Sequence, residues 1–127
     1  MRFMITVKGS ENAGMPPQEL MDGIAQLGME ATRAGVLVET GGLLPSAAGA
    51  RMRVKGGKIV ATDGPFSEAK EVVGGYAVYE VASLDQAKEW TRRFLDLHVK
   101  HWNGWEGEAE IRPVMDPTAF GPGGNGH

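Results

Sequence analysis

Residues 51–62 read RMRVKGGKIVAT, two runs of alternating apolar and basic residues separated by Gly56-Gly57. Two glycines between such runs are typical of a two-residue β-hairpin turn with positive φ at both central positions. The spacing therefore predicts a hairpin, and its register pairs Lys55 with Lys58, Val54 with Ile59, Arg53 with Val60 and Met52 with Ala61. One face of this hairpin is then apolar, and the other carries Arg51, Arg53, Lys55 and Lys58.

The segments on the two sides of the hairpin have the same pattern of elements. Moving outward, strands are predicted at 36–44 and 72–81, helices at 17–34 and from residue 83 onward, and outer strands at 2–8 and 109–114. The first helix opens at Pro16-Pro17, because proline is tolerated in a helical first turn, and ends at Gly35. Apolar residues recur at helical spacing in both helices, at Leu20, Ile24, Leu27 and Ala31 in the first and at Ala87, Trp90, Phe94 and Leu97 in the second.

This order predicts an α+β protein with a ferredoxin-like βαββαβ arrangement, in which two helices cover one face of an antiparallel sheet. The second helix has a capping box, Ser83-Leu84-Asp85-Gln86, as its start signal. Residues 1–115 are expected to form one domain. Residues 116–127, rich in glycine and proline, are expected to form a flexible tail.

The predicted strands are apolar on both faces. In 76–81, Tyr76 and Val78 fall on one face and Ala77 and Tyr79 on the other, and Met4 lies opposite the face of Phe3 and Ile5. A sheet that carries helices on one face only is usually polar on its other face. A second apolar face needs a cover, so the sequence predicts a homodimer.

Composition limits the classes of function. The chain has 127 residues, a formal net charge of −3 and no cysteine, which excludes disulfides, thiolate nucleophiles and cysteine-ligated zinc. The lack of a basic excess argues against a nucleic-acid partner, and no apolar run is long enough to span a membrane. A cytoplasmic location is expected.

The motif Asp63-Gly64-Pro65-Phe66, followed by the charged stretch 67–71 and by Gly74-Gly75-Tyr76, resembles the signature of the YCII-related proteins that carry a DGPF motif. The opening at 2–5, the segment 34–37 and the closing segment 110–114 fit the same pattern, so the resemblance spans about residues 1–115. It implies the dimeric α+β barrel superfamily, in which two ferredoxin-like sheets pack face to face.

The resemblance also implies acid–base catalysis by a histidine–aspartate pair, and genes of this group often lie near alternative sigma factors. The suspected histidine of the family lies in an N-terminal helix, and residues 17–34 contain no histidine.

Asp63, His98 and His101 are the candidate catalytic residues. Asp63 directly follows a predicted strand and is the candidate acid or base, although Asp-Gly-Pro is also a favourable turn sequence. His98 and His101 are three residues apart near a helix end, where either imidazole is a candidate proton acceptor and where the helix dipole also favours histidine. No third ligand stands at a recognised spacing, so neither a metal nor a cofactor is predicted.

Arg53, Tyr76 and Tyr79 are the candidate ligand-binding residues, and the basic hairpin face suggests a small anionic ligand. The same basic face is also typical of a solvated strand that resists aggregation. Two classes of function remain open: cofactor-free acid–base chemistry such as isomerisation, and a non-catalytic ligand-sensing or regulatory module that acts with a protein partner. The sequence leaves open whether the protein is an enzyme.

Overall fold

The computed structural model describes residues 1–66 and 71–115. Its order of elements confirms the predicted α+β class, and the predicted tail 116–127 lies outside the described residues. The strands and helices are β1 (Arg2–Gly9), η1 (Glu11–Ala13), α1 (Gln18–Arg33), β2 (Leu37–Gly42), η2 (Ser46–Ala48), β3 (Ala50–Lys55), β4 (Lys58–Asp63), β5 (Val72–Glu80), α2 (Leu84–His101) and β6 (Gly107–Pro113).

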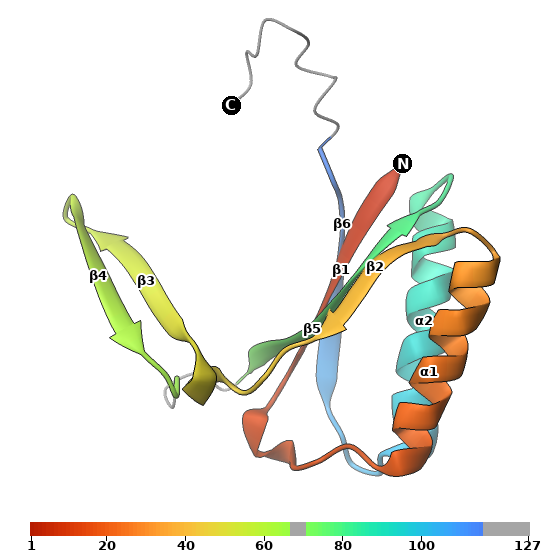
Figure 1. Cartoon of the computed structure of the whole chain (residues 1–127), viewed down its shortest axis with the longest axis horizontal. Coiled ribbons are helices and arrows are strands. Elements are labelled where there is room, and N and C mark those ends of the chain that lie inside the picture. Colours follow the sequence, from red (N-terminus) through yellow and green to blue (C-terminus); the bar gives the residue numbers. More distant parts are fainter. Residues whose placement is uncertain (67–70, 116–127) are drawn as a thin grey trace, which may run out of the picture.

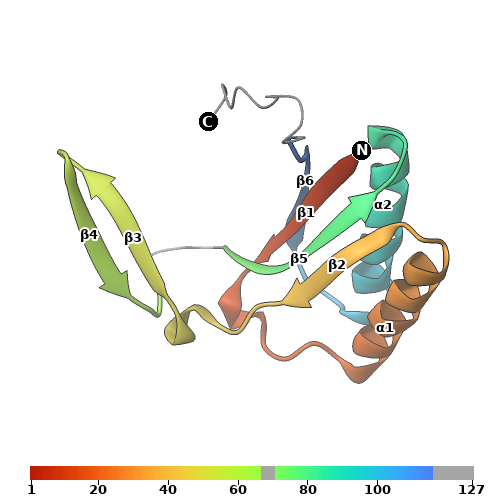
Figure 2. The ribbon, with the colours of Figure 1, turned by 45° about the horizontal axis from the view of Figure 1, so that its top comes forward.

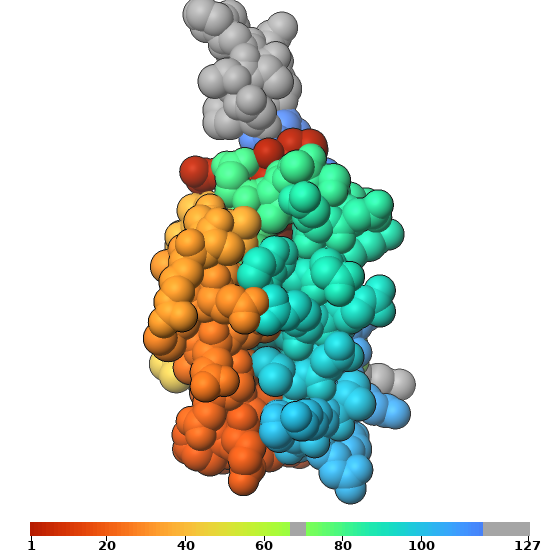
Figure 3. Space-filling model, turned by 90° about the vertical axis from the view of Figure 1, so that its right-hand side faces the viewer, coloured from red at the N-terminus to blue at the C-terminus, as the bar shows by residue number. Residues whose placement is uncertain are grey.

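The main sheet contains four strands in the order β2-β5-β1-β6, and every neighbouring pair is antiparallel. Each helix therefore links two parallel strands that are separated by one antiparallel strand, which is the ferredoxin-like arrangement. α1 and α2 lie side by side on one face of this sheet (Figures 1 and 3).

The hydrophobic core lies between the helices and this face of the sheet. Phe3 and Ile5 of β1 pair with Tyr79 and Ala77 of β5, so these four side chains share one face. Phe3 is 2% exposed and Ile5 4% exposed, and both pack with the helix residues Ala31 and Ala87, which are fully buried. The alternation of β1 thus selects the face that the helices cover.

Local sequence signals set the end of α1 and the start of α2. After α1, Gly35 has a φ of 75°, and the amides of Gly35 and Val36 donate back to Thr32 and Ala31, both at 3.0 Å. This pair of bonds is a Schellman motif. At the start of α2, the Ser83 hydroxyl accepts from the Gln86 amide at 3.2 Å, as the predicted capping box requires.

β3 and β4 form a separate two-stranded sheet with the predicted register, from Lys55–Lys58 through Met52–Ala61. Gly56 and Gly57 have φ values of 58° and 77°, as predicted for the turn. In Figures 1 and 2 this hairpin projects on the side of the main sheet opposite the helices. The hairpin is therefore an appendage to the four-stranded sheet and does not extend it.

The face of the main sheet away from the helices, called the open face below, has an apolar centre with charged residues around it. Met4, which is 39% exposed, pairs with Val78, and Thr6 pairs with Tyr76. Acidic side chains from three strands share this face: Glu39, Glu80, Glu108 and Glu110. The predicted dimer through this face remains a prediction.

Among residues 1–66 and 71–115, no helix is long and apolar enough to cross a membrane.

Candidate functional site

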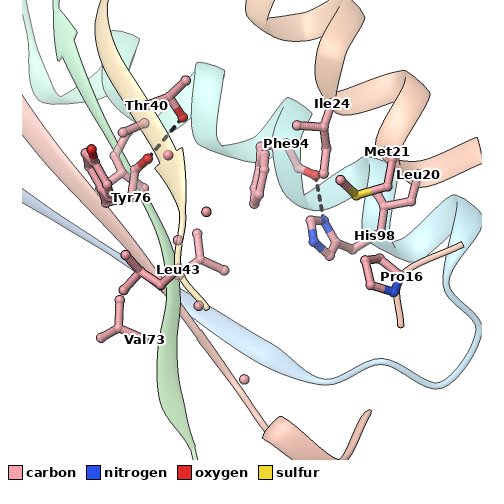
Figure 4. A pocket seen from close by; sticks show the side chains of 18 of the residues that line it. Pro16, Leu20, Met21, Ile24, Thr40, Leu43, Val73, Tyr76, Phe94 and His98 are labelled. Carbon is pink, nitrogen blue, oxygen red and sulfur yellow. Dashed lines mark hydrogen bonds between the residues drawn. The ribbon is translucent and has the colours of Figure 1, made fainter. Parts of the chain in front are cut away.

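A cavity of about 610 Å³ lies between the two helices and one end of the main sheet. Its walls come from β1, β2, β5, both helices and the loops on either side of them. Figure 4 shows part of it, with Leu43 and Val73 on the sheet side and residues of α1 and α2 opposite them. The cavity has the size and position typical of a small-molecule site.

The cavity exists because the sheet carries small residues at this end. Gly42 of β2 pairs with Gly75 of β5, and Gly75 pairs with Val7 of β1, all in the row that faces the helices. No heavy atom outside the adjacent residues lies within 4 Å of the position of a Cβ on Gly42. Since glycine has no side chain to fill the gap, a space remains between sheet and helices.

Apolar and aromatic side chains dominate the rest of the lining. Leu20, Ile24 and Leu27 contribute from α1, and Trp90, Phe94 and His98 from α2. Trp102 and Trp105, which follow α2, also line the cavity. The Trp105 ring lies against Gly9, where a Cβ atom would be 3.4 Å from Cζ2 of the indole. Glycine at position 9 therefore lets this tryptophan close one end of the cavity.

His98 is the one histidine among the described lining residues, and it is only 6% exposed. Its Nδ1 lies 3.0 Å from the carbonyl oxygen of Phe94. A carbonyl oxygen can only accept, so Nδ1 carries the proton and Nε2 is left as an acceptor. Figure 4 shows the ring beside Leu20 and Met21, at the cavity wall.

Aromatic rings surround His98 and keep water away from it. The centroids of Phe94 and Trp105 lie 4.7 and 4.5 Å from that of the imidazole, and Trp102 is stacked at 6.4 Å. This burial lowers the pKa of His98 below its ordinary value, and the hydrogen bond to the Phe94 carbonyl offsets the effect only in part. The imidazole is therefore neutral at pH 7 and can accept a proton or a hydrogen bond.

Few other polar groups face the cavity. The Thr40 hydroxyl donates to the carbonyl of Tyr76 at 3.0 Å. Glu11 lines the rim, and both of its carboxylate oxygens accept from Ser46, from the amide and from the hydroxyl, which lowers the pKa of Glu11. Among the described lining residues there is no lysine or arginine. This lining does not match the small anionic ligand expected from the basic hairpin.

The predicted site residues fall in different places. His98, Tyr76 and Tyr79 are among the cavity-lining residues, whereas Asp63, His101 and Arg53 are not. Tyr79 is buried, and this raises the pKa of its hydroxyl.

The phenol of Tyr76 lies on the open face, where its hydroxyl donates to Glu39 at 2.7 Å, which raises the pKa of Tyr76. Tyr76 is thus one of the cavity-lining residues, but its hydroxyl lies on the other face of the sheet and points away from His98 (Figure 4).

Asp63 and His98 are not brought together within the chain. Asp63 is exposed at the end of β4, at the base of the projecting hairpin, whereas His98 lies in the last turns of α2 on the other side of the sheet (Figures 1 and 2). Arg53 lies on the exposed hairpin itself.

Residues 63–66 form a junction between loops. A Cβ atom on Gly64 would overlap the carbonyl oxygen of Ser46, so this position needs glycine. The amide of Phe66 donates to the Ser46 hydroxyl at 2.9 Å, and the Arg51 guanidinium lies 4.2 Å from the centroid of the Phe66 ring. The Asp-Gly-Pro-Phe stretch therefore holds the hairpin base to the loop that contains Ser46.

Sequence reasoning missed two features of the cavity. The first is the cluster of His98 with Trp102 and Trp105, whose rings pack around the imidazole. The second is the contact of Gly41-Gly42 with Gly74-Gly75 across β2 and β5. Two Gly-Gly pairs in adjacent strands were a visible signal for a gap in the core, but their pairing depends on the tertiary fold.

Among residues 1–66 and 71–115, no group of three His, Asp or Glu side chains gathers closely enough to hold a metal ion.

The fold and the site define a ferredoxin-like α+β protein with an apolar cavity that contains one neutral histidine. Residues 1–95 match the family model of the YCII-related domain. The chain is also 30% identical over 97 residues to an uncharacterized protein of Rhizobium meliloti (strain 1021), a match that covers 76% of this chain and 74% of the relative. The chain belongs to the YCII-related family.

Proposed function

We propose that the chain binds a small, largely apolar organic molecule in this cavity and that His98 takes up a proton from it. The observation that carries the proposal is a buried, neutral imidazole whose Nδ1 is already bonded to Phe94, in a cavity of about 610 Å³. The bound molecule donates an O–H or an activated C–H to Nε2. The apolar lining favours a neutral, planar ligand over an anion.

The proposed reaction is a proton shift without a cofactor. His98 Nε2 removes a proton from one atom of the ligand and returns it to another, so the product is an isomer and the imidazole ends neutral. A base with a pKa lowered by burial is present in its unprotonated form at neutral pH, which suits it to this step.

A binding test can use three bicyclic probes of the same size. Naphthol is neutral and donates one hydrogen bond, naphthalene donates none, and naphthoate is an anion. We expect naphthol to shift the NMR signals of Leu20 and Ile24 at the lowest concentration, because only naphthol satisfies His98 in an apolar site. Tightest binding by naphthoate would contradict the neutral-ligand proposal.

Two substitutions test whether naphthol binds in the cavity or elsewhere on the protein. Gly42→Leu places a side chain in open space at the cavity wall and should abolish naphthol binding. Val38→Leu is the matched control, since Val38 lies on the same strand, is 44% exposed and does not line the cavity. Equal naphthol affinity of the two variants would show that the probe binds outside the cavity.

One observation favours a second candidate function, a ligand-sensing module without catalysis. Glu11 is the one carboxylate among the described lining residues, and both of its oxygens bond to Ser46. Among the described lining residues, His98 therefore has no free carboxylate as an acid partner to position it or to complete a relay.

Deuterium exchange distinguishes the two functions. The bicyclic ketone tetralone has exchangeable protons beside its carbonyl, so a base in the cavity should accelerate their replacement by deuterium. We expect acceleration by the wild type and its loss in His98→Asn, with His101→Asn as the control. Binding of tetralone without accelerated exchange would favour the sensing module.

A further inference from the structure

The apolar lining of the cavity continues outward to exposed side chains, called the apolar rim below. Met15 and Leu44 line the cavity and are 89% and 80% exposed, and Leu43 and Met21 line it and are 50% and 47% exposed. Leu20, deeper in the same cavity, is fully buried. The lining therefore extends from the core to the surface of the protein.

The four residues of the apolar rim come from both sides of the cavity. Met15 precedes α1 and Met21 belongs to it, whereas Leu43 and Leu44 directly follow β2. Figure 4 shows Met21 on the helix side and Leu43 on the sheet side. Single exposed apolar residues are common on protein surfaces, but a group that continues a cavity is typical of a surface that contacts a ligand.

Glycines beside the apolar rim leave open space. Gly14 and Gly42 line the cavity next to Met15 and Leu43, and a Cβ on either glycine would have no heavy atom of a non-adjacent residue within 4 Å. Methionine side chains are flexible and adapt to ligands of different shapes. The rim can therefore accept an apolar group that reaches out of the cavity.

The lining holds no positive charge that would bind an anionic group. In the described part of the lining, lysine and arginine are absent, and both oxygens of the Glu11 carboxylate are bonded to Ser46. A carboxylate or phosphate on the ligand would lose its hydration here without gaining a partner. The group that occupies the rim should therefore be uncharged.

We propose that the ligand carries an alkyl substituent that extends from the ring beside His98 and lies along the apolar rim. This inference rests on the proposed function, in which His98 binds the acidic O–H or C–H of the ring in the depth of the cavity. A volume of about 610 Å³ is typical of sites for drug-sized ligands, so a bicyclic ring leaves room for a substituent. The ligand class is thus an alkylated phenol or cyclic ketone whose polar group points inward.

Two probes that differ only in the alkyl substituent test this inference. Titration calorimetry compares naphthol with a naphthol that carries a butyl group on the ring without the hydroxyl. We expect the butyl group to raise the affinity of the wild type roughly tenfold or more, since each buried methylene contributes up to about fourfold. Butylnaphthol should also shift the NMR signals of Met15 and Leu44, which naphthol leaves unchanged.

Matched substitutions locate the butyl group on the protein. Met15→Ser and Leu44→Ser shorten side chains of the apolar rim. Met29→Ser and Leu84→Ser make the same changes at exposed residues that do not line the cavity. We expect the gain in affinity from the butyl group to fall to about threefold or less in the two rim variants and to keep its wild-type value in the two controls.

The outcomes separate this inference from the proposed function. Naphthol binding without a gain from the butyl group would overturn the inference and leave the cavity site intact. An equal gain in the wild type and all four variants would place the butyl group elsewhere and would also overturn it. Failure of both probes to bind would overturn the proposed function and this inference together. Absence of the gain, with slower sedimentation of Leu44→Ser than of the wild type, would indicate that a second copy covers the rim, and this too overturns the inference.

Discussion

At Gly64 the backbone passes so close to Ser46 that no side chain fits. The Ser46 hydroxyl accepts from the Phe66 amide and donates to Glu11, so one serine connects η1, η2 and the turn after β4. Asp63 is the first residue of this junction, and it is exposed. At the scale of single residues, packing explains the Gly-Pro-Phe part of this stretch, and the proposed chemistry rests on His98 alone.

Gly64→Ala should destabilise the protein by at least about 2 kcal/mol, because its Cβ would displace the backbone of Ser46. Gly49→Ala is the matched control, since a Cβ there would lie 3.7 Å from the same carbonyl oxygen, in ordinary contact. Urea unfolding followed by circular dichroism measures both changes. Equal midpoints for the two variants would contradict the packing explanation.

His98 should make stability depend on pH. Its pKa is lowered in the folded state, so the unfolded state binds more protons as the pH falls. The stability that His98 contributes is complete above the unfolded pKa of about 6.5 and is lost as the pH falls through the folded pKa.

Wild type should therefore lose more unfolding free energy between pH 8 and pH 5 than His98→Asn, whose amide can keep the bond to Phe94. Urea titrations at both pH values give this comparison. His101→Asn should follow the wild type, and a wild-type pH dependence in His98→Asn would argue against a buried neutral imidazole.

At the scale of elements, two glycines in α1 have different surroundings. A Cβ on Gly23 would lie 2.9 Å from Cδ2 of Leu97 in α2, whereas a Cβ on Gly28 would have no such neighbour within 4 Å. Gly23 thus allows the helices to approach, and Gly28 leaves space at the cavity. Glycine thus allows close contact between the helices at one position of α1 and leaves open space at another.

Gly28→Ala should stabilise the protein by about 0.5–1 kcal/mol, because alanine is the better helix former and its Cβ enters open space. Gly23→Ala should stabilise it less, since Leu97 has to move. Thermal unfolding of both variants provides the measurement. A larger gain in Gly23→Ala than in Gly28→Ala would show that the helix contact is looser than described.

At the scale of the whole molecule, residues 1–66 and 71–115 form two hydrogen-bonded units, the four-stranded sheet with its helices and the projecting hairpin. β1 and β5 have partners on both sides, whereas β3 and β4 each have one. The junction at Ser46 connects the base of the hairpin to η1. The two units should therefore differ in their resistance to local opening.

Amide hydrogen exchange should be slowest in β1 and β5, which have hydrogen-bonded partners on both sides. Amides of β3 and β4 should exchange faster, because each of these strands has one partner and the hairpin lies outside the four-stranded sheet. Mass spectrometry of peptic fragments measures both rates. Exchange in the hairpin as slow as that in β1 and β5 would contradict this prediction.

The sequence by itself determined the features that depend on neighbouring residues. The turn at Gly56-Gly57 and the alternation around it specify the hairpin register, and the helix spacing and stop signals predict α1 and α2. These signals act over a few residues, so they can be found without the fold. The strand and helix order then limits the topology to the ferredoxin-like arrangement.

Only the tertiary structure decided the site. His98 is four residues after Phe94 and shares its helix face, but its burial requires Trp105 to return against Gly9. The cavity requires Gly42 to meet Gly75 across two strands, and the hairpin had to separate from the sheet to place Asp63 away from His98. The physical reason is that burial and empty space arise from contacts between residues distant in sequence, which local periodicity does not encode.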